Sequence, residues 1–332
     1  MFLFVVCILV LYVLSLLSGK ERLDTFEKGK TTPLKGILAV LIVMHHLSYQ
    51  TQWLSFFHRW GTPIVSVFFF ISGYGLMKSY LSKGDAYLQG FIRKRIVKAL
   101  LLPFLLAWVL YRIINHNSVP DIPTALEHLL VNGYTVLPYS WYVFAALLFY
   151  IYFLIVYRIL REGGGKFTVL ALSSLTAGYI ALAMYLDYPP CWFVSAMAFP
   201  VGVWYGKHET AVHQFWHTPA RYYLTVPLCL LLVGLCVATK NVTAYLIAYM
   251  LLPLIIVCLC SKVKVERLNA YKPVRWISGI SYEIYLCQGI SMSLLRGNYL
   301  SIHSNMLYIL FTLLLTILLA YGIKKLKLLS IH

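Results

Sequence analysis

The stretch KGILAVLIVMHHLSYQTQW, residues 35–53, decides the fold, because it combines an apolar run of membrane-spanning length with histidines near its middle. Crossing about 30 Å of hydrocarbon takes about 20 apolar residues in a helix that rises about 1.5 Å per residue. Similar stretches recur along the chain. We predict about eleven spanning helices, at residues 2–18, 35–53, 61–80, 99–115, 139–157, 167–186, 192–206, 222–238, 243–260, 277–295 and 305–323.

The composition points the same way. Of 332 residues, 61% are hydrophobic and 12% are charged, about half the charged fraction of a soluble domain. A soluble enzyme is therefore excluded, and the fold class is an all-α polytopic membrane helix bundle. We expect residues 1–30 to form an additional N-terminal transmembrane helix and a cytoplasmic loop, because this segment lacks the basic start and small-residue cleavage site of a signal peptide. Residues 31–332 form a membrane domain with the other ten helices.

The distribution of charge predicts the topology. The formal net charge is +17, but the basic residues occupy alternate loops and do not gather on one face of a folded domain, so nucleic-acid binding is not expected. Of 28 Lys and Arg residues, only Arg59, Arg112, Lys240 and Arg296 lie on one side. Because positive loops stay in the cytoplasm, we expect a multi-pass protein of the cell membrane with its N-terminus outside and its C-terminus inside.

Polar groups inside spans are costly and are therefore functional candidates. Lys35 and His46 are eleven residues apart, which places them on one helix face, about 16 Å apart along the axis, whereas His45 points elsewhere. An imidazole at mid-membrane can act as general base toward an alcohol. A structural histidine that hydrogen-bonds between helices is the equally weighted alternative.

A basic run, FIRKRIVKALLLPF, occupies residues 91–104 at the start of a span. Arg93, Lys94, Arg95 and Lys98 together can hold phosphate groups through charge-assisted hydrogen bonds. Taken alone, the run is more typical of a topology signal that also attracts anionic membrane lipid.

A third polar group lies in WISGISYEIYLCQG, residues 276–289. Glu283 is predicted to be buried and to need a cationic partner, for which Lys35, His46 or the run at 93–98 are candidates. Ser281, Tyr285 and Gln288 form one polar stripe. A contact that only joins helices is an equally plausible role. The seven scattered cysteines and the histidine spacing match no metal motif, so no metal is expected.

At these places the chain resembles acyltransferase family 3, integral membrane enzymes that O-acylate carbohydrates and other acceptors. Leu34-Lys35-Gly36 leads to His46 in the family's register of a basic residue, ten residues and the catalytic histidine. The other matching stretches are VFFFISGYGL at 67–76 with Ser72 and Gly73, Phe91, Arg95, Lys98 and Pro103, Ser140-Trp141-Tyr142, and Ser281 to Leu286 followed by Gln288. The resemblance covers about residues 31–323.

Three positions depart from the family pattern. Lys35 and Lys98 stand where the family has arginine, and Gln288 stands where it has histidine. Lysine keeps the charge but loses the bidentate fork of arginine, and glutamine has no acid or base function. A family relative that has lost its activity is therefore one alternative.

The resemblance implies transfer of an acyl group, with acetyl-CoA as the expected donor, to a hydroxyl of an extracytoplasmic carbohydrate or lipid-linked glycan. Its site residues would be His46 as general base with Lys35 and Glu283, the cofactor-binding Arg93, Arg95 and Lys98, and the substrate-binding Ser72, Trp141, Tyr142, Tyr285 and Gln288. Trp141 and Tyr142 are expected on the acceptor side. The rival hypothesis is a transporter or flippase of lipid-linked sugars or another anionic solute, although no inverted repeat supports it.

Overall fold

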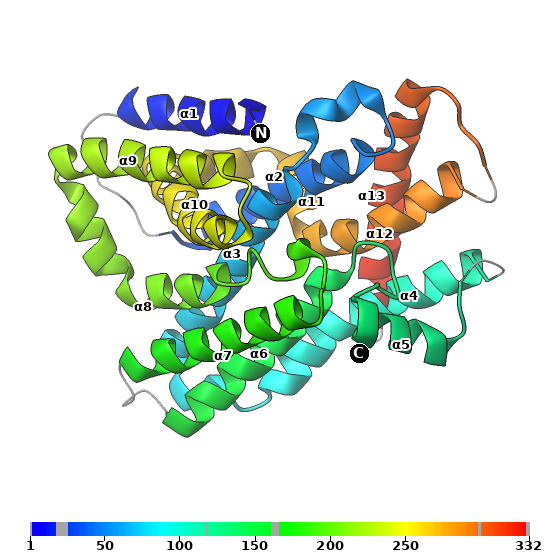
Figure 1. Ribbon diagram of the computed structural model, residues 1–332, viewed down its shortest axis with the longest axis horizontal. Coiled ribbons are helices and arrows are strands. Elements are labelled where there is room, and N and C mark those ends of the chain that lie inside the picture. The colour runs from blue at the N-terminus through cyan, green and yellow to red at the C-terminus, as the bar shows by residue number, and fades with distance from the viewer. Residues whose placement is uncertain (1, 18–25, 117–118, 161–165, 298–299, 330–332) are drawn as a thin grey trace.

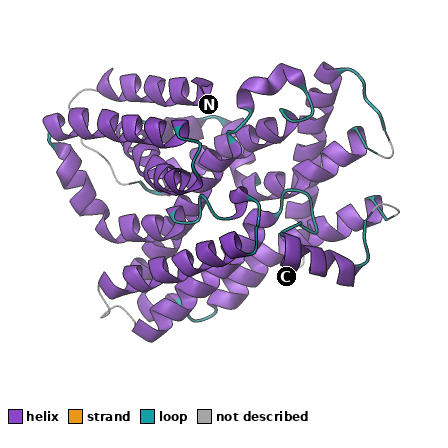
Figure 2. Cartoon of the chain, viewed as in Figure 1, coloured by secondary structure: helices purple, strands orange, loops and turns teal. Residues whose placement is uncertain are grey.

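A computed structural model describes residues 2–17, 26–116, 119–160, 166–297 and 300–329. Helices make up nearly all of these residues, and loops join them (Figure 2). No strand occurs within these ranges, where the only bridge outside helices joins Arg296 to Ser301. The predicted all-α class is therefore confirmed.

Seven helical stretches are long and apolar enough to cross a membrane. They contain α3 (Gly61–Lys83), the continuous pair η3 (Ile92–Leu101) and α4 (Leu102–Ile114), α6 (Trp141–Leu160), α7 (Lys166–Tyr185), α9 (Pro219–Ala238), α10 (Val242–Lys262) and α13 (Asn305–Leu329). Each coincides with a predicted span, so the multi-pass membrane character is confirmed.

The other four predicted spans form helices of a different kind. They are α1 (Phe2–Leu17), α2 (Lys28–Leu47), α8 (Ala198–His217) and α12 (Ser281–Leu295), which fall short in length or apolar character. Several polar residues of these helices are buried in the bundle, where a polar group finds partners that lipid cannot supply. They include His46 of α2, Glu209 of α8, and Glu283 and Gln288 of α12.

Two predicted spans are interrupted. The span at 192–206 begins in the short turn η5 (Pro190–Trp192) and loop before α8 starts. The span at 277–295 is broken at Ile280, between α11 (Lys272–Gly279) and α12. The long loop after α4 also contains a helix, α5 (Ile122–Asn132), that the sequence pattern did not reveal.

The α3 helix runs through the middle of the molecule (Figure 1). It packs on α2, α8 and α10, while α12 packs on α2, α4 and α13. The pairs α6 with α7 and α9 with α10 flank this centre on two sides (Figure 1). Helices far apart in the sequence thus converge on α3 and α12.

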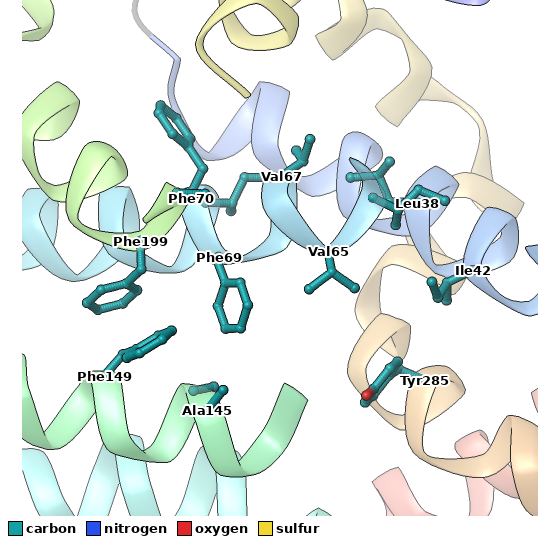
Figure 3. Close-up of a cluster of buried hydrophobic side chains, with 14 of the residues drawn as sticks. Leu38, Ile42, Val65, Val67, Phe69, Phe70, Ala145, Phe149, Phe199 and Tyr285 are labelled. Carbon is teal, nitrogen blue, oxygen red and sulfur yellow. The ribbon is translucent and has the colours of Figure 1, made fainter. Parts of the chain in front are cut away.

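Glycines bring α3 and α8 into backbone contact. A Cβ atom on Gly202 would lie 2.1 Å from the carbonyl oxygen of Phe70, and one on Gly73 would lie 2.2 Å from that of Phe199. Small residues let membrane helices approach this closely. Around the contact, the rings of Phe69, Phe149 and Phe199 point toward one another (Figure 3), with centroids 5.2 and 5.4 Å apart for successive pairs. This packing fixes the wall of the cavity described next.

Candidate active site

A cavity of about 780 Å³ opens between α2, α3, η3, α6, α12 and α13. Its lining is strongly basic, with six cationic side chains and two carboxylates. The charged residues are Lys28, Lys35, Lys78, Arg95, Lys324, Lys327, Glu27 and Glu283. Ser72, Tyr142 and Tyr285 add hydroxyl groups to the wall. All six cations belong to the side on which 24 of the basic residues were counted, here called the basic face.

Helical spacing explains how several cations reach one cavity. Lys28 and Lys35 are seven residues apart on α2, and Lys324 and Lys327 are three apart near the end of α13. Both intervals return to about the same helix face. The packing of α12 against α2 and α13 then brings these two faces to one space. Lys78, Lys324 and Lys327 were counted only as topology signals from the sequence.

Glu283 finds its cationic partners on α13. Its Oε1 lies 3.8 Å from Nζ of Lys324 and 3.6 Å from Nζ of Lys327. The sequence suggested Lys35, His46 or the 93–98 run, and within the described ranges no ion pair joins Glu283 to any of these. The partners differ because α12 packs directly on α13, the last helix, which the sequence pattern could not place.

A second buried carboxylate, which was not predicted from the sequence, lies on α8. Glu209 of α8 is 3% exposed and accepts hydrogen bonds from the Phe26 backbone N–H at 2.6 Å, the Tyr74 hydroxyl at 3.1 Å and Lys78 Nζ at 2.9 Å. It follows His208, where α8 is kinked. Because Lys78 and Tyr74 line the cavity, these hydrogen bonds to Glu209 fix part of the cavity wall.

Of the predicted phosphate-binding residues, only Arg95 lines the cavity. Its guanidinium donates to the Ser79 hydroxyl at 3.3 Å and lies 5.4 Å from the ring centroid of Tyr87. Arg93 is exposed, and Lys98 is half-buried outside the lining. The reason is that η3 is a π-helix, whose i→i+5 turns hold more residues than an α-turn and rotate Lys98 away from the face of Arg95.

His46 is buried, with 8% of its surface exposed, and does not itself line the cavity. Its Nδ1 lies 2.9 Å from Oε1 of Gln288, and its ring stacks on Tyr139 with centroids 3.8 Å apart. His45 points elsewhere, as predicted, with Nδ1 3.1 Å from the carbonyl oxygen of Phe57. The immediate neighbours of His46 are thus polar and aromatic groups.

We name Tyr139, Tyr142 and Tyr285 the tyrosine partition, because Tyr142 and Tyr285 line the cavity while Tyr139 stacks on His46. The Tyr285 hydroxyl donates to the backbone carbonyl of Tyr139, and the rings of Tyr142 and Tyr285 lie 5.5 Å apart. Ser72 and Tyr142 hydroxyls are 3.3 Å apart. Figure 3 shows Tyr285 on α12, with its hydroxyl turned away from Ile42 of α2. Tyr285 and Tyr139 thus connect the cavity wall to the imidazole.

Tyr142 lies at the inner end of the basic cavity, whereas Trp141 lies outside the lining and packs on Phe69 and Trp192, each at 6.3 Å. The described residues contain no group of three or more His, Cys, Asp or Glu that could hold a metal.

Fold and site together define a multi-pass membrane protein whose buried polar groups surround one basic cavity beside a secluded imidazole. The family model of the acyltransferase domain, acyltransferase family 3, matches residues 34–325, so the chain belongs to that family, as its motifs predicted, and is a membrane acyltransferase. The match begins after α1. No match was found among curated proteins or among solved structures.

Proposed function

We propose that the protein transfers an acyl group, acetyl in the expected case, from acyl-CoA to a hydroxyl of an extracytoplasmic carbohydrate or lipid-linked glycan. The basic face is cytoplasmic in this proposal, with the N-terminus outside, the C-terminus inside and the plasma membrane as location. His46 is the general base. The proposal rests on family membership together with the cavity.

The observation that carries the donor assignment is the charge of the cavity. Six cations against two carboxylates leave an excess of positive charge around a space of about 780 Å³. The phosphates of CoA are multiply anionic and pair well with Lys and Arg. The hydroxyls of Ser72, Tyr142 and Tyr285 lie at the inner end, where the acyl thioester would lie. The residues present therefore fit a donor that enters from the basic face.

The chemical step uses one proton and one acyl group. His46 Nε2 removes the proton from the acceptor hydroxyl while the oxygen attacks the thioester carbonyl. The carbon–sulfur bond breaks, the acyl group stays on the acceptor oxygen, and the thiolate of CoA takes up the proton. For the thioester to reach His46, the Tyr285 side chain must turn out of the tyrosine partition.

Two measurements on purified protein test this function. Calorimetry with CoA tests donor binding, and transfer of labelled acetyl from acetyl-CoA to glycans is followed in membrane vesicles that contain envelope glycans. We expect His46→Ala to lower glycan labelling by about 100-fold or more. His128→Ala, an exposed histidine between α4 and α6, is the matched control. Full labelling by His46→Ala, or solute transport without consumption of acetyl-CoA, would contradict the proposal.

A further inference from the structure

We propose that Gln288 is a positioning residue that holds His46 in the tautomer with its proton on Nδ1. This leaves the Nε2 lone pair as the base, so the inference rests on the proposed function of His46. It replaces the substrate-binding role that the sequence suggested for Gln288, because this side chain lies outside the cavity lining.

The orientation of the Gln288 amide is fixed by its other partner. Its Nε2 donates to the backbone carbonyl of Tyr285 at 3.1 Å. A carbonyl oxygen can only accept, so the nitrogen end of the amide must face Tyr285 and the oxygen end must face His46. The oxygen lies 2.9 Å from Nδ1 and can only accept as well. Nδ1 must therefore carry the proton.

A neutral imidazole has one N–H, so a proton on Nδ1 leaves Nε2 unprotonated. Gln288 is 0% exposed, so its oxygen is shielded from bulk solvent. Tyr139, stacked on the ring at an interplanar angle of 20°, restricts tilting of the imidazole. The Gln288 amide thus sets the tautomer of His46, and Tyr139 sets the plane of its ring. In a Ser-His-Asp triad, the carboxylate alone fixes both the tautomer and the orientation of the histidine.

A purely structural bond between α2 and α12 is the competing explanation, and the choice of variants separates the two. Gln288→Met keeps the length of the side chain but removes the acceptor. Gln288→Glu keeps an acceptor oxygen for Nδ1, and its protonated form can still donate to the Tyr285 carbonyl. Ser291→Ala is the matched control, because Ser291 is equally buried on α12 and its hydroxyl donates to the Cys287 carbonyl of the same helix.

The readouts are kcat and KM for acetyl-CoA and the ¹⁵N spectrum of His46, assigned by its absence in His46→Ala. We expect Gln288→Met to lower kcat by about 10- to 100-fold, as loss of a histidine-orienting partner does, with KM nearly unchanged. Its His46 spectrum should show loss of the Nδ1–H tautomer. Gln288→Glu should restore most of kcat, and Ser291→Ala should match the unmodified protein.

Three results would overturn the inference. The first is a Gln288→Met variant with unchanged kcat while His46→Ala is inactive, which leaves the proposed function intact. The second is an unchanged Nδ1–H signal in Gln288→Met, and the third is a loss in Ser291→Ala as large as in Gln288→Met. Full activity of His46→Ala would instead refute the proposed function itself.

Discussion

Removal of the Glu209 side chain is the sharpest test of how the cavity wall is held. In Glu209→Ala, the Phe26 N–H and the Tyr74 hydroxyl lose their acceptor while they stay buried. Each orphaned buried donor costs about 1–3 kcal/mol. The Lys78 side chain is 42% exposed, so its ion pair adds at most about 1 kcal/mol. We expect a loss of about 2–7 kcal/mol in the free energy of unfolding.

Glu209→Gln is the matched variant. Its amide oxygen can take the place of Oε1 and accept from both Phe26 and Tyr74, while its amide nitrogen meets Lys78 and loses the ion pair. We expect this variant to lose only about 1–2 kcal/mol.

The assay is thermal unfolding in detergent, followed by tryptophan fluorescence at one scan rate, because unfolding of membrane proteins is often irreversible. Glu209→Ala should lower the midpoint by several degrees more than Glu209→Gln. Equal midpoints for the two variants would refute the assignment of the stabilisation to the neutral donors. A Glu209→Ala midpoint equal to that of the unmodified protein would refute the network altogether.

Three further outcomes are expected. Gly73→Ala should destabilise the protein by about 1–3 kcal/mol, because its Cβ would clash with the Phe199 carbonyl. Gly75→Ala, whose Cβ would meet no atom within 4 Å, should leave the stability unchanged, and equal unfolding midpoints for the two variants would contradict the close helix contact. Lys35→Met should raise KM for acetyl-CoA about tenfold or more, because Lys35 lines the cavity. Lys325→Met, at an exposed position, is the control, and equal KM values for the two variants would contradict donor binding in the cavity. Tyr285→Phe loses one hydrogen bond of the tyrosine partition and should therefore increase the hydrolysis of acetyl-CoA in the absence of acceptor about 2- to 10-fold. Unchanged hydrolysis would show that this hydrogen bond does not hold the tyrosine partition together.

The sequence predicted the parts of the fold that depend on local patterns. Apolar length identified the seven helical stretches that are long enough to span a membrane. The apolar run at 35–53 also predicted one helix for Lys35 and His46, which both lie on α2. The predicted polar stripe of Ser281, Tyr285 and Gln288 lies on α12, but its residues meet different surroundings. Ser281 and Tyr285 line the cavity, whereas Gln288 contacts His46. Periodicity gives the face of a helix, and only packing gives what that face meets.

The missed residues were those whose role depends on packing between distant helices. Lys78, Lys324 and Lys327 looked like topology signals, because nothing local shows that the ends of α3 and α13 meet one cavity. Glu209 lies beyond the predicted span at 192–206, since the kinked α8 continues to His217. The π-turns of η3 have no sequence signal, so the exclusion of Lys98 from the cavity lining could not be foreseen.

The tyrosine partition also bears on the electrical integrity of the membrane. An enzyme that meets one substrate from each side risks a continuous aqueous pore, through which ions would run down the gradients that the cell maintains. Tyr142 and Tyr285 pack ring against ring, and Tyr285 is bonded to the backbone of Tyr139. Under the proposed function, this packing would keep the basic cavity from joining the acceptor side as a continuous water-filled path.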